Sequence, residues 1–245
     1  SIDASTELPY SDYTRTLDID NAIHTVMYKE NGITFKREYF MSYPDNVMVM
    51  RLTSDSKKGK LSRIISLESL HTDKTITADG HTITMTGYPT PVSGDKRVGD
   101  AWKNGLIYAQ QLVVKNKGGK ISVVDGTKLK VEDADEIIVL MSAATNYVQC
   151  MDDSYNYFSQ EDPLEKVQAT LHKVADKKYT ALLATHQKDY HSLYDRMRLN
   201  LGNLPEAPVA PTDSLLKGMD ENTNSEQENQ YLEMLYFQFG RYLLI

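Results

Sequence analysis

Four short turn motifs constrain the fold of the first 145 residues more than any other feature of this sequence. Each motif is a pair of residues that tolerates positive φ, and each separates stretches rich in β-branched and aromatic residues. The pairs are Asn31-Gly32, Asp79-Gly80, Gly118-Gly119 and Asp125-Gly126. Such pairs favour tight hairpins, and no long helical pattern separates the stretches. The sequence therefore predicts antiparallel sheets rather than alternating strands and helices.

Two apolar runs indicate that these sheets are buried. Val47–Met50 and Ile137–Met141 are continuously apolar, which is typical of strands that are covered on both faces. The segment His81–Thr86 instead alternates Ile83 and Met85 with threonines, as a strand with one buried face does. The first part of the chain is therefore expected to form a sandwich.

A helical period replaces the strand pattern from about residue 160. Asp162 and Glu165 form a capping box around Pro163, which suits the first turn of a helix. One face of that helix carries apolar residues at helical spacing, namely Leu164, Val167, Leu171 and Val174. A second helix is expected over Tyr179–Met197. Its apolar stripe consists of Leu183, Tyr190, Tyr194 and Met197.

A proline-rich connector follows the second helix. It covers Asn203–Pro211 and is the expected boundary between domains, because such segments are stiff. A short helix is expected over Asp213–Lys217, ended by Gly218, and an acidic polar stretch follows it. Ser225-x-x-Glu228 then forms a second capping box and starts the last helix.

The last helix is apolar on nearly every side. Eleven of the fifteen residues in Tyr231–Ile245 are apolar, so this helix needs protein around it. Its short length, together with Glu233 and Arg241, argues against a membrane span. We therefore expect the sequence to be a fragment whose partner helices lie beyond Ile245. The alternative is a natural C-terminal helix that docks on the sandwich.

Composition excludes several classes of protein. The 245 residues carry a formal net charge of −7 and no basic tract, which argues against nucleic acid as a partner. The single cysteine, Cys150, excludes an internal disulfide and a cysteine-based zinc site. No apolar stretch is long enough to cross a bilayer. The six histidines form no ligand motif, so neither a metal nor a cofactor is expected.

Catalytic signals are sparse. Neighbouring carboxylates occur in three pairs, which are Asp18 and Asp20, Asp133 and Asp135, and Asp152 and Asp153. Adjacent acids on loops usually face solvent, whereas an acid–base pair needs two carboxyl groups that face one cleft. Ser54-x-x-Lys57 matches a hydrolase motif in letters only and is interpreted as a turn. No catalytic residue is assigned in this sequence.

One long stretch without a period is a candidate binding loop. It covers Gly87–Gly105 and holds the only tryptophan, Trp102, close to Arg97 and Asp100. An aromatic face beside charged hydrogen-bonding groups suits sugar recognition, so Trp102, Arg97 and Asp100 are the candidate substrate-binding residues. The alternative, which the frequent burial of aromatic side chains favours, is that Trp102 packs on the sandwich or on a neighbouring domain.

An ordered series of motifs resembles glycoside hydrolase family 95, the α-L-fucosidase and α-L-galactosidase family. The motifs of the first half are Tyr13-x-Arg15-x-Leu17-Asp18-Ile19-Asp20-x-Ala22, Arg37-Glu38-x-Phe40-x-Ser42-x-Pro44-Asp45 and Ala143-Ala144-Thr145-Asn146-Tyr147. Those of the helical half are His186-x-x-Asp189-Tyr190-x-x-Leu193-Tyr194-x-Arg196-Met197, Pro211-Thr212-Asp213 and Leu235–Ile245. The resemblance covers about residues 10–245, and it is the order of the motifs that makes it specific.

The resemblance implies a mainly β fold, in which an antiparallel β super-sandwich is followed by a helical linker and the first helix of an (α/α)6 barrel. The corresponding boundaries are 1–158 for the sandwich, with its front part missing, 159–202 for the linker, 203–224 for the connector and 225–245 for the barrel helix.

The resemblance also implies an inverting exo-glycosidase that acts without a metal on terminal α-L-fucosyl or α-L-galactosyl groups of an oligosaccharide or glycan. Its acid and base would lie in the barrel, contributed by the rest of the same polypeptide, so this segment alone is expected to be inactive. The expected location is periplasmic or extracellular. The alternative is a non-catalytic β-sandwich module that binds carbohydrate or supports a neighbouring domain.

Overall fold

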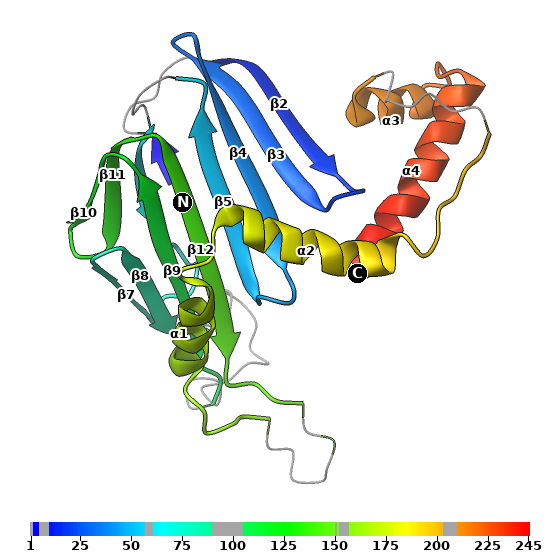
Figure 1. The fold of residues 1–245 in the computed structure, drawn as a ribbon. Coiled ribbons are helices and arrows are strands. Elements are labelled where there is room, and N and C mark those ends of the chain that lie inside the picture. The colour runs from blue at the N-terminus through cyan, green and yellow to red at the C-terminus, as the bar shows by residue number, and fades with distance from the viewer. Residues whose placement is uncertain are drawn as a thin grey trace. The chain divides into compact units, whose positions relative to one another are not determined.

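A computed structural model describes residues 2–4, 10–56, 61–89, 105–149, 151, 157–202 and 210–245 (Figure 1). The chain divides into two compact units. The first comprises residues 1–16 and 24–186, and the second comprises residues 17–23 and 187–245. No described helix is long and apolar enough to cross a membrane.

The larger described sheet has eight strands. In spatial order they are β2 (Tyr10–Asp18), β3 (Ile23–Glu30), β4 (Ile33–Ser42), β5 (Val47–Ser54), β12 (Glu136–Thr145), β9 (Tyr108–Lys117), β8 (Thr82–Gly87) and β7 (Lys74–Asp79). Every pairing whose register is described in this sheet is antiparallel. The predicted sheet class is therefore confirmed.

A smaller sheet of four described strands faces one side of the larger sheet. Its order is β1 (Ile2–Ala4), β6 (Leu61–Ser66), β11 (Lys128–Ala134) and β10 (Lys120–Val124). Apolar residues of both sheets form the core between them, including Leu61 and Leu129 of the small sheet and Ile83, Leu112 and Ile137 of the large one. This arrangement is a β-sandwich, as predicted.

The turn motifs differ in what they do. Both residues have positive φ in Asn31-Gly32 and in Asp125-Gly126, and each pair lies in the turn of a hairpin. Asp79 instead pairs with Thr82, so the turn residues there are Gly80 and His81. Only Gly80 of these has positive φ, as a type II′ turn requires of its first residue.

Gly118-Gly119 does not form the predicted hairpin. It carries the chain from β9 in the large sheet to β10 in the small sheet. Gly119 has a φ of +65°, and a Cβ atom there would lie 2.1 Å from the carbonyl oxygen of Glu132. Glycine is required because the crossing brings the two backbones together.

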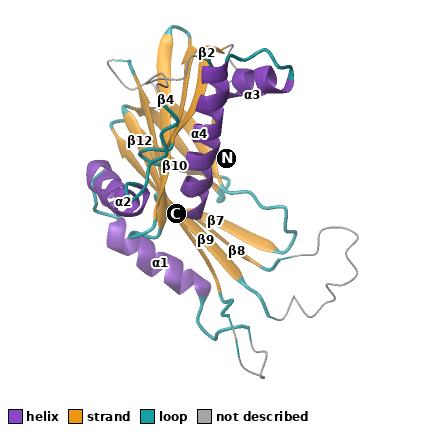
Figure 2. Ribbon diagram, turned by 90° about the vertical axis from the view of Figure 1, so that its right-hand side faces the viewer, coloured by secondary structure: helices purple, strands orange, loops and turns teal. Residues whose placement is uncertain are grey.

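Two helices follow the sandwich, α1 (Pro163–Val174) and α2 (Tyr179–Tyr194). Helix α1 lies across the other face of the large sheet, against β9 and β12 (Figure 2). Asp162 caps α1 through the N–H of Leu164, as predicted. Helix α2 ends at Tyr194, three residues earlier than predicted, and Met197 is 51% exposed outside the expected stripe.

The core against the helices accounts for the two apolar runs. Val49 and Leu140 contact the helix-side cluster, in which Val167 of α1 and Leu182 of α2 are buried. Their strand neighbours Leu52 and Ile137 point the other way and belong to the core between the sheets. Central strands β5 and β12 are thus covered on both faces, as predicted.

The second unit contains α3 (Thr212–Asp220) and α4 (Glu226–Leu244). The capping box of Ser225 and Glu228 is present at the start of α4. Helix α3 continues through Gly218 rather than ending there, which corrects the expectation from sequence. A Cβ atom on Gly218 would lie 1.9 Å from Asn224 Oδ1, so this glycine allows a close side-chain approach instead of stopping the helix.

Alanine at Gly119 is expected to destabilise the protein more than alanine at Gly126. Both glycines have a φ of +65°, so each substitution carries the strain of a left-handed residue, about 1–2 kcal/mol. Only Gly119→Ala adds a backbone clash, whereas nothing lies within 4 Å of the Cβ position at Gly126. Urea unfolding followed by circular dichroism measures both losses. Equal losses would contradict the crossing geometry.

Candidate functional site

The predicted sugar-binding residues Trp102, Arg97 and Asp100 lie outside the described residues, as does Cys150. The candidate site is therefore built from the polar clusters that the structure describes. Among the described residues, no group of three or more histidine, cysteine, aspartate or glutamate side chains is arranged to hold a metal ion.

The first two carboxylate pairs do not form a catalytic arrangement. Asp18 accepts hydrogen bonds from the backbone N–H groups of Asp20 and Asn21, both at 3.1 Å, and so organises its own turn. Asp133 has a φ of 55° and lies at a register shift of β11 beside Asp135; both are exposed. These four acids therefore occupy turns on the surface. Asp152 and Asp153 lie outside the described residues.

The serine of the Ser54-x-x-Lys57 motif is the last residue of β5 and pairs with Phe35, so it lies on a strand rather than in the expected turn. Lys57 lies outside the described residues.

An ion triad lies on the sheet face that the helices cover. Arg51 donates from Nε to Glu136 at 2.5 Å, and its Nη1 lies 3.4 Å from Glu38. The guanidinium also lies over the ring of Tyr179, 4.6 Å from its centroid. Burial opposes the charge of Arg51, but the Glu136 hydrogen bond and both carboxylates leave its pKa raised. Arg51 thus engages both acids, which suits a structural role.

The same surroundings act on the phenol of Tyr179. Burial, with a further contribution from the charge of Glu38, raises the pKa of Tyr179 to about 12. A phenol this weakly acidic stays protonated near neutral pH, so Tyr179 is not a general base there.

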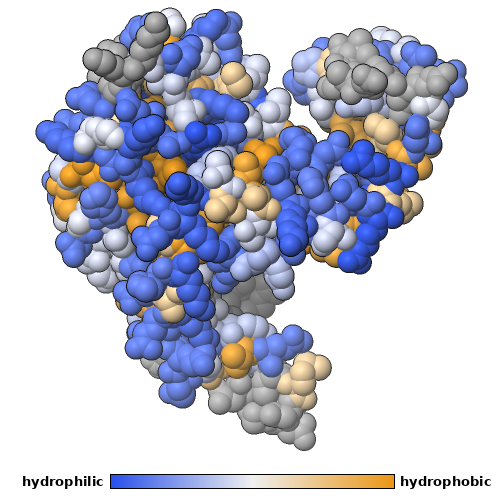
Figure 3. Space-filling model, viewed as in Figure 1, coloured by the Kyte–Doolittle hydropathy of each residue, from blue (hydrophilic) through white to orange (hydrophobic). Residues whose placement is uncertain are grey.

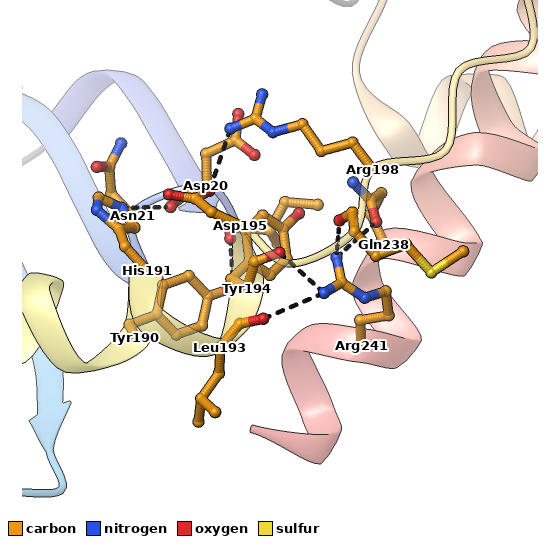
Figure 4. Close-up of polar contacts among 12 residues, drawn as sticks. Asp20, Asn21, Tyr190, His191, Leu193, Tyr194, Asp195, Arg198, Gln238 and Arg241 are labelled. Carbon is orange, nitrogen blue, oxygen red and sulfur yellow. Dashed lines mark hydrogen bonds and ion pairs between the residues drawn. The ribbon is translucent and has the colours of Figure 1, made fainter.

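A second cluster joins α4 to the end of α2 within the second unit (Figure 4). The guanidinium of Arg241 donates to the carbonyl oxygens of Leu193, Tyr194 and Met197. It also lies over the ring of Tyr194, 4.9 Å from the centroid. These carbonyls belong to the last turn of α2 and to the residues after it, where helical partners are absent. A cation is favoured there because the dipole of the helix is negative at its C-terminus.

The other side of α2 holds the loop at residues 17–23. The hydroxyl of Tyr190 donates to the carbonyl oxygen of Ile19 at 2.5 Å. A ring nitrogen of His191, Nε2, lies 2.9 Å from the carbonyl oxygen of Asp20. Burial raises the pKa of Tyr190, and the neighbouring Tyr194 adds to this rise. The cluster therefore fastens a loop and a helix to α2 and leaves its tyrosines protonated.

Neither cluster supplies two carboxyl groups that face one open cleft, among the residues described here. Both clusters consist of cations that hold carboxylates or carbonyl groups from distant parts of the sequence. Sequence analysis did not identify them. The available signal was the position of Arg241, a single cation in an otherwise apolar run.

Comparison with known proteins identifies the class. Residues 1–150 match the family model "Glycosyl hydrolase family 65, N-terminal domain", and residues 178–245 match "Glycosyl hydrolase family 95 catalytic domain". A solved structure, "Putative kojibiose phosphorylase from human microbiome", aligns with a TM-score of 0.50 over 79% of this chain and 27% of its own. Its sequence identity of 12% means that this likeness concerns the fold alone.

Relatives of known name match almost the whole chain. "Alpha-L-fucosidase 2" of Arabidopsis thaliana is 32% identical, and "Probable alpha-fucosidase A" of Aspergillus niger is 29% identical. Each match covers 95% of this chain and 28% of the relative. The chain thus spans little more than a quarter of the length of these relatives.

The sandwich and the helices after it define the class as the N-terminal part of a glycoside hydrolase. The chain belongs to the glycosyl hydrolases, with an N-terminal domain of the family 65 type and a sequence similar to family 95 proteins along nearly its whole length. The resemblance to family 95 is therefore confirmed, although the family model that matches the sandwich carries the number 65.

Replacing Arg241 by methionine is expected to destabilise the second unit by about 2 kcal/mol, because hydrogen bonds to a charged group are lost and carbonyls lose their partner. Arg198→Met is the matched control, since the Arg198–Asp195 pair is well exposed at 3.4 Å and contributes little. Urea unfolding of both variants provides the comparison. A loss no larger than that of the control would show that Arg241 does not hold α4.

Tyr179→Phe is expected to make stability less sensitive to alkali. The pKa of Tyr179 is raised to about 12 in the folded protein, so the unfolded chain loses this proton first as the pH rises. Its stabilising contribution is complete below about pH 10 and falls by about 1.4 kcal/mol at pH 11. Unfolding free energies at pH 8 and pH 11 should differ less in Tyr179→Phe by this amount. An identical difference would refute the assignment.

Proposed function

We propose that this chain is part of an exo-acting glycoside hydrolase that removes terminal α-L-fucosyl or α-L-galactosyl groups from glycans. The observation that carries this proposal is the continuous similarity to proteins named α-fucosidases, which covers 95% of the chain in two of them. The match of residues 178–245 to a catalytic domain of family 95 supports the same activity.

The proposed reaction proceeds with inversion at the anomeric carbon. A carboxylic acid protonates the leaving oxygen, and a base activates water on the opposite side of the sugar ring. Neither role is assigned to a residue of this chain. The described carboxylates organise turns or pair with Arg51, so the acid and the base are proposed to lie elsewhere in the enzyme.

We propose the domain boundaries 1–158, 159–202, 203–224 and 225–245 for the sandwich, the linker, the connector and the first barrel helix. Helix α4 exposes large apolar side chains over much of its length, and hydrophobic surface is visible on the lobe that holds α3 and α4 (Figure 3). Tyr236 is 82% exposed, Leu243 is 65% exposed and Leu244 is 89% exposed. Such a surface marks a contact site, and its proposed partner is the α/α barrel of the same polypeptide.

In this proposal the chain is a scaffold. The sandwich supports the linker helices, and the Arg241 cluster fixes the end of α2 to α4, from which the barrel continues. By itself the chain is proposed to be inactive. The enzyme is proposed to act in the periplasm or outside the cell, where such glycans are accessible.

We also propose Trp102, Arg97 and Asp100 as contacts to the glycan. The support is their sequence context alone, which combines an aromatic ring with charged hydrogen-bonding groups. This proposal agrees with the second candidate function, a sandwich module that binds carbohydrate or supports a neighbouring domain.

The activity is tested with the natural polypeptide that contains this sequence. It is expected to release L-fucose or L-galactose from α-linked oligosaccharides, with the β-anomer appearing first in NMR spectra of the product. The 245-residue chain alone should release none. If the natural polypeptide releases neither sugar, the proposed function is wrong, and first appearance of the α-anomer would refute inversion.

Trp102→Ala distinguishes glycan contact from packing. A glycan contact predicts at least a tenfold weaker binding of fucosylated oligosaccharide with unchanged unfolding, because stacking on an aromatic ring is lost. Isothermal titration measures the affinity, and Tyr88→Ala is the control, since Tyr88 is an exposed aromatic residue at the start of the same connection. Loss of stability with unchanged affinity would instead establish that Trp102 packs against protein.

A further inference from the structure

The two sheets of the sandwich differ in extent. The small sheet has four described strands and the large sheet eight. Strand β6 contacts β5, and β11 contacts β7, β8 and β9, so the small sheet lies over that half of the large one (Figure 1). Strand β1 forms the edge of the small sheet on the other side of β6. The inner face is the side of the large sheet that faces the small sheet.

Burial on the inner face falls from one end of the strands to the other. The registers place Phe35, Leu52 and Ile137 on this face, and each is at most 6% exposed. At the far end of β4, on the same face, Met41 is 65% exposed. Side chains that would belong to a core are therefore open at this end.

The open part of the inner face has a distinct composition. It consists of His24, Tyr39, Met41, Met48, Met50 and Met141, which adjoin one another through the registers of β3, β4, β5 and β12. Met50 and Met141 also pack against the core between the sheets, so this open face continues that core. Methionine side chains adapt to varied partners, and such a continuous apolar surface is rarely left exposed to water.

Two arginines beside the open face lack sufficient acceptors. Arg37 and Arg63 each donate to the hydroxyl of Tyr28 at 3.2 Å, and the nearest ion-pair partner of Arg63 is Glu30 at 4.0 Å. The Nε atoms of both arginines are buried without a hydrogen-bond partner among the described residues. Two guanidinium groups against one carboxylate leave a positive charge that burial makes unfavourable.

We propose that a further extended segment of the same polypeptide pairs with the free edge of β1, covers the open inner face and brings a carboxylate to Arg37 and Arg63. Three observations favour this occupant. The face continues the existing core, its charge calls for an acid, and the chain spans only 28% of the length of its relatives. The inference rests on the proposed membership in a longer enzyme but not on the sugar that the enzyme releases.

Methionine oxidation tests the proposal. Dilute peroxide is applied to the 245-residue chain and to the natural polypeptide that contains it, and peptide mass spectrometry follows Met48, Met50 and Met141. We expect these three residues to be oxidised at least tenfold more slowly in the natural polypeptide, because burial excludes the oxidant. Cross-linking should place an aspartate or glutamate of the covering segment next to Arg37.

A charge-reversal pair provides the control. Arg37→Glu places a carboxylate on the inner face and should speed oxidation of these methionines at least fivefold in the natural polypeptide. Lys36→Glu makes the same change one residue away on the opposite face and should leave the rates unchanged. Hydrolysis of α-L-fucosides is measured separately, so an inactive protein with protected methionines would overturn the function and leave the covering segment intact.

Several results would overturn the covering segment. One is equal oxidation of the three methionines in both polypeptides. Another is a 245-residue chain that protects them by forming dimers in light scattering, since the occupant would then be a second copy. Protection that appears only after fucosylated oligosaccharide is added would identify the face as a sugar-binding surface instead.

Discussion

Burial of β5 and β12 on both faces is the constraint on which the rest of the first unit depends. Adjacent residues of these strands point to opposite sides, so Val49 and Leu140 contact the helices while Leu52 and Ile137 enter the sandwich. Each such side chain contributes about 1.5–3 kcal/mol when it leaves water. Neither the small sheet nor α1 would bury its own apolar side without these two strands, and both layers therefore require the central pair.

Cations from distant segments complete the helix ends. Helices α1 and α2 finish without a glycine cap, and their last carbonyl groups would lack partners. Lys115 of β9 donates to the carbonyl oxygens of Ala175 at 2.6 Å and Lys177 at 3.0 Å, just after α1. Arg241 does the same after α2. One physical device thus attaches helices in both units, and it links their geometry to sequence positions far away.

Local patterns explain what the sequence predicted well. Turn pairs, caps and apolar period act between near neighbours, so the hairpin at Asn31-Gly32 and the capping box of Ser225 could be recognised from sequence. The crossing at Gly118-Gly119 could not, because a turn pair looks the same whether the next strand stays in the sheet or leaves it. The early end of α2 likewise depends on Arg241, 47 residues after Tyr194. Arg51 and Glu136 are 85 residues apart, and nothing local announces their contact. The candidate sugar contacts Trp102, Arg97 and Asp100 remain a prediction.

The central claim is that β5 and β12 form the stable middle of a sheet buried on both faces. Native-state hydrogen exchange of individual backbone amides tests it most directly. The amides of Val49, Val139 and Leu140 should exchange only through global unfolding, with the same free energy as urea unfolding, while amides of the exposed edge strand β2 exchange at least a hundredfold faster. Exchange of the central amides at the rate of β2 would contradict the two-sided core.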